Sequence, residues 1–182
     1  MIQEKYNRRI FDEGTEESIR TFSHLRSNVL SPVGITQGDD VLMLDPDSVS
    51  LVEWIAEQSA SVTIGVSPDY DRSINELEIL LPDTIDKAAL DDINSTFNII
   101  ISLGALADTP ASLKKRLSPQ GRLVYAFPQK DRTASFTKNL LTEAGFDEIT
   151  TYRVSPDYMY TTEIYAEDYL GGGAGDYLLI AR

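Results

Sequence analysis

The stretch that decides the fold is DDVLMLDPDSVSLVEWI, residues 39–55. It begins with an apolar run at 41–44, passes through a polar turn at 45–49, and continues with apolar residues at helical spacing. This order predicts a strand, a tight turn and a helix. The β-branched run at 61–66 follows and predicts a second, parallel strand, which completes a βαβ unit.

The turn of this unit has an unusual composition. In nucleotide- and cofactor-binding folds, the turn after the first strand holds the ligand and is rich in glycine, because backbone must approach the ligand closely. Here the turn carries Asp45, Pro46, Asp47, Ser48 and Val49. The sequence therefore predicts a cofactor-type fold in which the usual chemistry of this turn is absent.

Length and charge limit the classes of protein to consider. With 182 residues, of which 42% are hydrophobic, we predict a single domain over residues 1–182 whose polar segment 1–15 is loosely held. The net charge of −13 opposes binding to nucleic acid or to anionic membranes. No apolar run approaches the ~20 residues of a membrane span. The N-terminus lacks a signal-peptide pattern, so we predict a cytoplasmic protein without membrane insertion.

The content of cysteine and histidine limits the chemistry. The chain has no cysteine and one histidine, which disfavours a disulfide framework, a thiolate nucleophile, a His/Cys metal site and a histidine-based triad. Acidic residues near the turn usually serve as turn and cap residues. No metal site is predicted, although a site made of carboxylates alone stays formally open.

The rest of the chain alternates helices and strands. Apolar residues at helical spacing predict helices at 16–30 and 133–144, and a Pro near a first turn predicts another that starts at Thr109. The segment 83–94 is predicted to be helical or irregular. Further strands are predicted at 77–81, 97–102, 122–127, 148–154 and 176–181.

This alternation predicts the fold class. We expect an α/β fold, a three-layer sandwich with a Rossmann-like, seven-stranded and mostly parallel sheet whose last strand is antiparallel. The strand at 98–102 should lie next to the strand at 41–44. The long link between the last two strands allows the antiparallel pairing.

The turns between these elements resemble those of one known family. LSPQGRL at 117–123 and LTEAGF at 141–146 are similar to the turns before the fifth and sixth strands of class I S-adenosylmethionine-dependent methyltransferases. LRSNVL at 25–30 and SPDYMYTTEIY at 155–165 resemble methyltransferase-like domains of bacterial cell-surface glycan biosynthesis. The resemblance covers most of the chain and implies the methyltransferase fold.

The chain departs from this family where the cofactor would bind. Asp45, Asp47 and Val49 stand in place of the family's G-x-G-x-G turn. Val66 stands where the family has an acidic residue that holds the ribose, and Asn98 stands in place of a frequent aspartate. In addition, the S-x-x-E pattern at 50–53 predicts a capping box, through which the first helix satisfies its own N-terminal donors.

Two functions follow from the resemblance. We favour a methyltransferase-fold domain that has lost S-adenosylmethionine binding, is not an enzyme, and contacts another protein or domain of a glycan-assembly system. The alternative is an active methyltransferase that acts on a sugar or another small acceptor. Self-association into a homo-oligomer is compatible with both.

The resemblance also implies which residues would serve an active enzyme. The candidates for contact with the cofactor are Asp45, Asp47, Val66, Asp83, Ser102 and Leu103. His24 and Asp157 are the candidates near the acceptor, although the ordinary interpretation of His24 is an exposed helix residue. The tyrosines of 158–169 are either half-buried edges or a surface for a partner or sugar.

Overall fold

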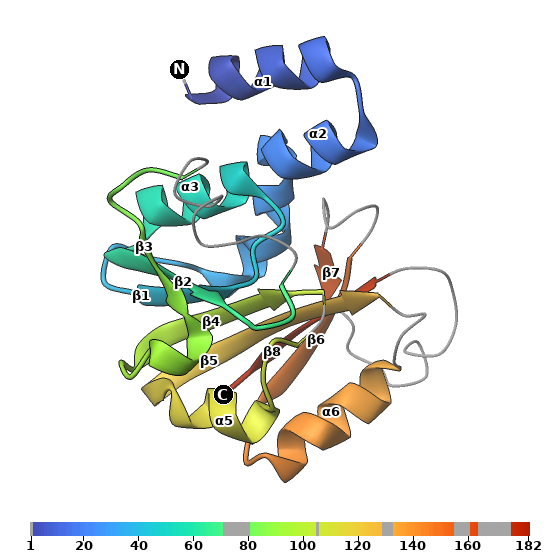
Figure 1. The fold of residues 1–182 in the computed structure, drawn as a ribbon. Coiled ribbons are helices and arrows are strands. Elements are labelled where there is room, and N and C mark those ends of the chain that lie inside the picture. Colours follow the sequence, from blue (N-terminus) through green and yellow to red (C-terminus); the bar gives the residue numbers. More distant parts are fainter. Residues whose placement is uncertain (1, 71–80, 105, 129–132, 155–160, 164–175) are drawn as a thin grey trace.

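Alternating strands and helices build three layers (Figure 1). The computed structural model describes residues 2–70, 81–104, 106–128, 133–154, 161–163 and 176–182. The helices are α1 (Ile2–Glu13), α2 (Glu16–Phe22), the 3-10 helix η1 (His24–Val33), α3 (Val49–Gln58), the 3-10 helix η2 (Leu90–Asp92), α5 (Pro110–Lys115) and α6 (Ala134–Glu143). The strands are β1 (Asp40–Leu44), β2 (Ser61–Val66), β3 (Asp86–Ala89), β4 (Phe97–Leu103), β5 (Leu117–Pro128), β6 (Ile149–Val154), β7 (Thr161–Glu163) and β8 (Asp176–Ala181).

The strands form one sheet in the order β3-β2-β1-β4-β5-β8-β6-β7. Strands β3, β2, β1, β4 and β5 are parallel, and β8 is antiparallel to both β5 and β6. The predicted seven-stranded sheet with an antiparallel last strand is confirmed, as is the pairing of β1 with β4, in which Val41 lies opposite Ile99. The short strand β7, which pairs with β6 at the edge of the sheet, was not predicted.

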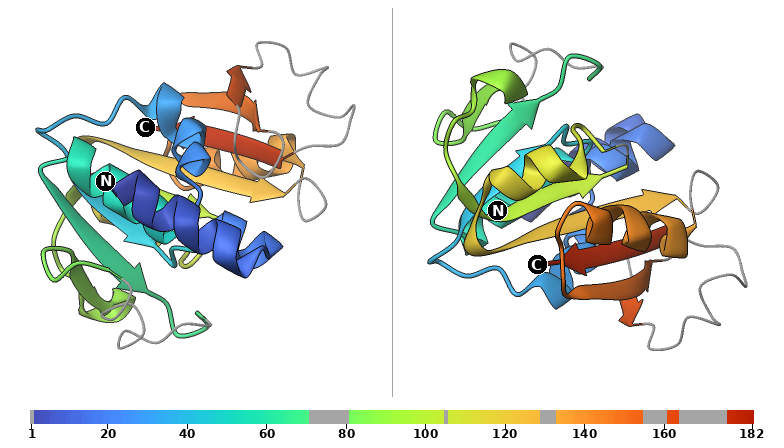
Figure 2. Two further views of the ribbon diagram at one scale, coloured as in Figure 1. Left: turned by 90° about the horizontal axis from the view of Figure 1, so that it is seen from above. Right: turned by 90° about the horizontal axis from the view of Figure 1, so that it is seen from below.

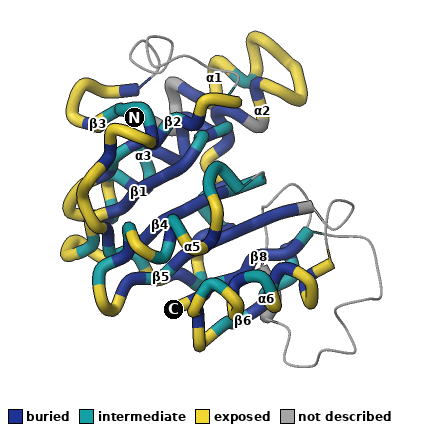
Figure 3. Tube along the Cα trace, turned by 60° about the horizontal axis from the view of Figure 1, so that its bottom comes forward, coloured by how far each residue is buried: buried dark blue, intermediate teal, exposed yellow. Residues whose placement is uncertain are grey.

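Two cores lie on the two faces of the sheet, because successive side chains of a strand point to opposite faces. Val41 and Met43 of β1 contribute to the core under α1, α2 and α3, whereas Leu42 and Leu44 contribute to the core under α5 and α6. Figure 2 shows the two helical layers from above and from below. Figure 3 shows that the central strands are the most buried part of the fold, as expected for a parallel sheet covered on both faces.

The predicted helix at 16–30 is wrong in its second half. Helix α2 ends at Phe22, Ser23 is extended, and η1 follows. The break coincides with polar contacts from the start of α3: Ser48 Oγ donates to the carbonyl of Thr21 at 3.2 Å, and Ser50 Oγ donates to the carbonyl of Ser23 at 2.9 Å. These hydroxyls satisfy carbonyl groups that a helix end leaves without intrahelical partners, and helical periodicity carries no sign of such contacts.

The third strand also differs from the prediction. The predicted strand at 77–81 lies outside the described residues except for Leu81, which is not in a strand. The structure instead has β3 within 83–94, the segment predicted to be helical or irregular. Its sequence, DKAA, has low intrinsic strand propensity, but β2 pairs with it in parallel register. Pairing at a sheet edge thus overrides local propensity here.

The N-terminal segment forms helix α1, which was not predicted from the sequence. Tyr6 of α1 is buried and stacks on Phe22 with ring centroids 5.4 Å apart, and Arg9 lies over the same ring at 4.2 Å. Burial raises the pKa of the Tyr6 hydroxyl, and the nearby Glu53 carboxylate raises it further. Tyr6 therefore stays protonated and neutral. How firmly residues 1–15 are held stays a prediction.

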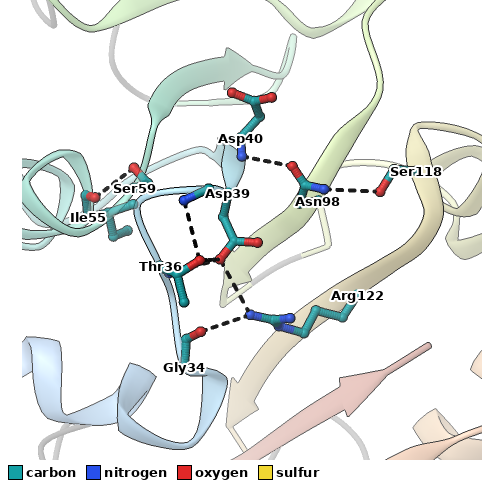
Figure 4. A network of polar contacts seen from close by, with 10 residues as sticks. Gly34, Thr36, Asp39, Asp40, Ile55, Ser59, Asn98, Ser118 and Arg122 are labelled. Atoms are coloured by element: carbon teal, nitrogen blue, oxygen red, sulfur yellow. Dashed lines mark hydrogen bonds and ion pairs between the residues drawn. The ribbon is translucent and has the colours of Figure 1, made fainter.

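Asn98 joins three strands at the amino ends of the central sheet (Figure 4). Its Oδ1 accepts from the backbone N–H of Asp40 at 2.9 Å, and its Nδ2 donates to Ser118 Oγ at 3.4 Å. The cofactor edge of a parallel sheet is at the carboxyl ends of its strands. In this chain Asn98 is therefore a structural residue, remote from a cofactor site.

Arg122 lies in the same network and ties β5 to the segment before β1 (Figure 4). Its Nη2 donates to the carbonyl of Gly34 at 3.2 Å and lies 3.9 Å from Asp39 Oδ2. Burial lowers the pKa of Arg122, and Asp39 opposes that shift. The ion pair thus compensates a half-buried cation.

Replacing Asn98 with alanine should lower the free energy of unfolding by about 1 kcal/mol, because it removes a partly exposed hydrogen bond to backbone. Denaturant unfolding with an unchanged m-value would measure this loss. Asn94→Ala is the control, since Asn94 is exposed and bonds only within its own turn. Equal losses for the two variants would contradict the role given to Asn98.

Candidate functional site

The candidate site lies where the carboxyl ends of β1, β2 and β4 meet. Leu44 at the end of β1 pairs with Gly65 of β2 on one side and with Ser102 of β4 on the other. Gly65 is closely packed, since a Cβ there would lie 3.0 Å from Leu44 Cδ2 and would require that side chain to shift. The three strands therefore end side by side. The residues that follow them lie at the carboxyl ends of the strands, which is where α/β sheets bind ligands.

Asp45 joins the ends of β1 and β2. Its Oδ1 accepts from the backbone N–H of Ser67 at 2.8 Å, and its Oδ2 accepts from Ser67 Oγ at 2.6 Å. The backbone N–H of Asp45 donates to the carbonyl of Gly65 at 3.1 Å. The φ angle of Asp45 is 45°, the only positive value at a non-glycine residue in the described part of the chain. Both carboxylate oxygens are thus used to close the turn onto the strand beside it.

Tyr70 makes a further contact across the turn. Its hydroxyl donates to the carbonyl of Pro46, and Pro46 itself is buried. Tyr70 follows β2 after a turn closed by a hydrogen bond from its N–H to the carbonyl of Ser67. The segment after β2 therefore bonds to two successive residues of the turn after β1.

Asp47 has a different partner from Asp45 and pairs with Arg26 of η1. Arg26 Nη1 donates to Asp47 Oδ2 at 2.9 Å. The Arg26 side chain is 2% exposed, whereas that of Asp47 is 38% exposed. The carboxylate therefore compensates a cation that the fold encloses almost completely.

The predicted capping box at 50–53 is wrong by two residues. The N-cap of α3 is Ser48, whose Oγ accepts from the N–H of Leu51 at 3.3 Å. Ser50 lies inside the helix and its hydroxyl is committed to Ser23. Spacing alone could not separate the two serines, because both precede the apolar face of the same helix.

The structure brings only part of the predicted site together. Val66 ends β2 and packs against the core under α1 to α3, Ser102 is 1% exposed at the end of β4, and Leu103 follows it. Asp83 is exposed in the segment before β3, and His24 is exposed at the start of η1. Asp157 and the four tyrosines of 158–169 lie outside the described residues.

Arg26, Ser67 and Tyr70 were not singled out from the sequence. Arg26 lies within residues 25–30, which were noted only for their resemblance to a family. A charged residue in an amphipathic helix is expected to be exposed, so nothing marked Arg26 as buried. Ser67 and Tyr70 lay in what was predicted as a plain turn. The altered turn at 45–49 was the one feature of the sequence that could have pointed to these residues. Carboxylates that replace glycines in a turn need hydrogen-bond donors or cations nearby.

The described part of the chain gives no indication of a metal site or of a membrane span. In the ranges that the structure describes, no three His, Cys, Asp or Glu side chains gather in a way that could hold a metal ion. Among those ranges, too, no helix has the length and apolar character needed to cross a membrane.

The fold has counterparts among solved structures. A TehB-like SAM-dependent methyltransferase from Corynebacterium glutamicum superposes with a TM-score of 0.61 at 12% identity, over 98% of this chain and 96% of that one. Precorrin-6y C5,15-methyltransferase from Geobacter metallireducens gives 0.56 at 14% identity, over 86% of each chain. The precorrin 8w decarboxylase of Methanobacterium thermoautotrophicum gives 0.53 at 16% identity, over 89% and 91%.

Sequence comparisons add no family to this likeness. No protein-family model matches the chain, and no curated protein matches it. Identities of this size show likeness of fold rather than of activity. The sheet order, the antiparallel β8 and the full-length superposition make this a class I methyltransferase fold.

Proposed function

We propose that this chain is a methyltransferase-fold domain that does not bind S-adenosylmethionine in the usual pose and acts as a non-catalytic scaffold or interaction domain. The observation that carries the proposal is the contact of Asp45 with Ser67. It spans the ends of β1 and β2, the two positions at which the resemblance places the cofactor's main contacts. A cofactor in that pose would have to displace the carboxylate from both donors.

Electrostatic repulsion and a missing hydrogen-bond acceptor both disfavour the usual pose of the cofactor. A cofactor carboxylate ~4 Å from Asp45 would meet repulsion on the order of 4 kcal/mol at an effective dielectric near 20, before screening. The side chain of Val66 offers no acceptor to the ribose hydroxyls, and the missing hydrogen bonds reduce the binding free energy by a further ~1.5–3 kcal/mol. Asp47 adds less than its charge suggests, because Arg26 already compensates it.

The proposed setting is bacterial surface glycan assembly, with another protein or domain of that system as the partner. Its support is the resemblance of residues 25–30 and 155–165 to domains of that kind. In the structure, residues 25–30 belong to η1, which supplies Arg26 to the turn after β1. The turn is thus tied to a segment that carries the resemblance.

The alternative is an active methyltransferase with a sugar or another small acceptor. It is favoured by the full-length likeness to proteins that are named methyltransferases. One further match of the same fold, a protein described as a putative methyltransferase, is complexed with SAH. For this alternative His24 is an accessible base candidate, since it is exposed.

Calorimetric titration with S-adenosylmethionine and with its demethylated product separates the two functions. We expect no binding tighter than roughly 100 μM for either ligand, a limit that calorimetry still measures. An active methyltransferase titrated in the same buffer is the control for ligand quality. A micromolar isotherm from this chain would favour the enzyme.

A further inference from the structure

Helix α1 has an outward face that the other described elements leave exposed. Figure 1 shows α1 as the outermost helix at its end of the molecule, and in the view from above in Figure 2 it lies in front of the other described elements. Tyr6 is buried and Ile10 packs against the same core, so these two residues mark the inner face. Arg8, Phe11 and Asp12 lie on the other side of the helix and are exposed.

Phe11 is the apolar centre of this outward face. It is 87% exposed, the largest fraction among the exposed large apolar residues in the described part of the chain. An aromatic ring gains free energy when it is buried against another protein surface. A single exposed apolar residue is common, however, so the ring alone identifies no partner.

The charges beside Phe11 have no partners of their own. Arg9 and Glu13 form an ion pair within α1, with 2.7 Å between Arg9 Nε and Glu13 Oε1. Arg8 and Asp12 have the same spacing, yet among the described residues neither side chain makes an ion pair or a hydrogen bond. Along the helix axis, the cation therefore lies on the amino-terminal side of Phe11 and the anion on its carboxyl-terminal side.

Helix α1 also differs in charge from the chain as a whole. The chain has a net charge of −13, which opposes the approach of two copies. In α1, basic and acidic residues balance: Lys5, Arg8 and Arg9 against Glu4, Asp12 and Glu13. Two copies can therefore meet at this helix without an excess of like charge on it.

We infer that the face formed by Arg8, Phe11 and Asp12 is a self-association surface, on which α1 of a second copy packs antiparallel across a twofold axis. A twofold interface brings residues of the two copies together in reciprocal pairs. With the axis level with Ile10, Arg8 of each copy lies opposite Asp12 of the other, and the two Phe11 residues lie about 3 Å apart along the helix axis. The face is thus complementary to itself in charge and in apolar area.

The dimer should be weak. A helix of 12 residues is about 18 Å long, and two such helices bury less than the roughly 1,600 Å² of a standard interface. We expect a dissociation constant on the order of 100 μM. This inference goes beyond the proposed function and does not depend on it, because the turn after β1 takes no part in the surface.

Charge reversal across the twofold axis is the test. Arg8→Asp places two carboxylates opposite each other in both pairs, and Asp12→Arg places two guanidinium groups opposite each other. Each variant alone should raise the dissociation constant at least about tenfold. A 1:1 mixture of the two variants restores both pairs in a heterodimer, so its dissociation constant should return to within about threefold of that of the unmodified chain. Sedimentation velocity from about 10 to 500 μM measures all four samples.

Two substitutions of phenylalanine provide a matched comparison. Phe11→Ser removes the apolar centre and should raise the dissociation constant at least about tenfold. Phe136→Ser should leave it unchanged, because Phe136 is exposed on α6 at the other end of the molecule (Figure 1). At about 5 μM, where the dimer is dissociated, the unfolding temperature of every variant should stay within about 2 °C of the unmodified chain, which excludes loss of the fold as the cause.

Two outcomes would overturn the inference. A chain that stays monomeric at about 500 μM would leave this face to solvent or to a different protein. A mixture of Arg8→Asp and Asp12→Arg that associates no better than either variant alone would exclude the reciprocal pairing. Neither outcome bears on the proposed function, which titration with S-adenosylmethionine tests separately.

Discussion

Replacing Phe127 with alanine is expected to lower the free energy of unfolding by about 3–5 kcal/mol, the largest loss that we predict for a single side chain. Phe127 is 1% exposed and lies in β5 opposite Tyr177 of the antiparallel strand β8. Its ring centroid is 5.1 Å from that of Tyr125 and 6.0 Å from that of Tyr177. Truncation removes both ring contacts and leaves a cavity in the core between the sheet and the layer of α5 and α6.

Phe136→Ala is the matched control for this prediction. It makes the same chemical change on the outer side of α6, where Phe136 is 57% exposed. Its loss should stay within about 0.5 kcal/mol, as for surface substitutions in general. Urea unfolding of both variants measures the difference. A small loss for Phe127→Ala would mean that β8 does not pack on β5 as the structure has it.

The central sheet could be predicted because its signals are local and redundant. The run FNIIIS at 97–102 is apolar on both faces, and such a run is stable only at the centre of a covered sheet. The order of strands and helices then leaves few topologies open. For the same reason the pairing of β4 with β1 and the antiparallel β8 followed from the sequence.

The elements that could not be predicted depend on contacts between distant residues. The helical spacing of apolar residues continues across Ser23. Hydroxyl groups at the start of α3 nevertheless bond to the carbonyls of Thr21 and Ser23, where α2 ends. Strand β3 forms at Asp86–Ala89 because β2 presents an edge to it rather than because DKAA favours a strand. In both places a tertiary partner decides the local structure.

The contacts of the candidate site could not be predicted from the sequence. The sequence identified the turn at 45–49 as altered, and the structure shows that Asp45 and Asp47 are each committed to a partner. Those partners lie 22 and 21 residues away along the chain. The sequence shows two carboxylates in the turn, but it does not show that Arg26 compensates the charge of Asp47.

Replacing Asp45 with alanine should lower the free energy of unfolding by about 2–4 kcal/mol, for two separable reasons. Alanine removes both acceptors of Ser67, and hydrogen bonds to a charged group contribute about 1.5–3 kcal/mol when buried, less at this half-buried position. Alanine must also adopt the φ of 45°, where its Cβ is strained by roughly 1 kcal/mol.

Two other substitutions at Asp45 separate these contributions. Asparagine keeps an acceptor and tolerates the left-handed conformation, so Asp45→Asn should lose about 1 kcal/mol. Glycine loses both acceptors but adopts positive φ freely, so Asp45→Gly should fall between asparagine and alanine. Asp69→Ala is the control, since Asp69 is exposed in the neighbouring turn, and should lose less than about 0.5 kcal/mol.

A double-mutant cycle with Ser67→Ala tests whether Asp45 acts through Ser67. Ser67→Ala removes one of the two contacts and keeps the backbone N–H. The losses of Asp45→Ala and Ser67→Ala should therefore add to more than the loss of the double variant, by about 0.5–1.5 kcal/mol. Simple additivity would mean that the hydroxyl of Ser67 does not couple to the Asp45 carboxylate. The support for the proposed function would then be reduced to the single contact between Asp45 and the backbone N–H of Ser67.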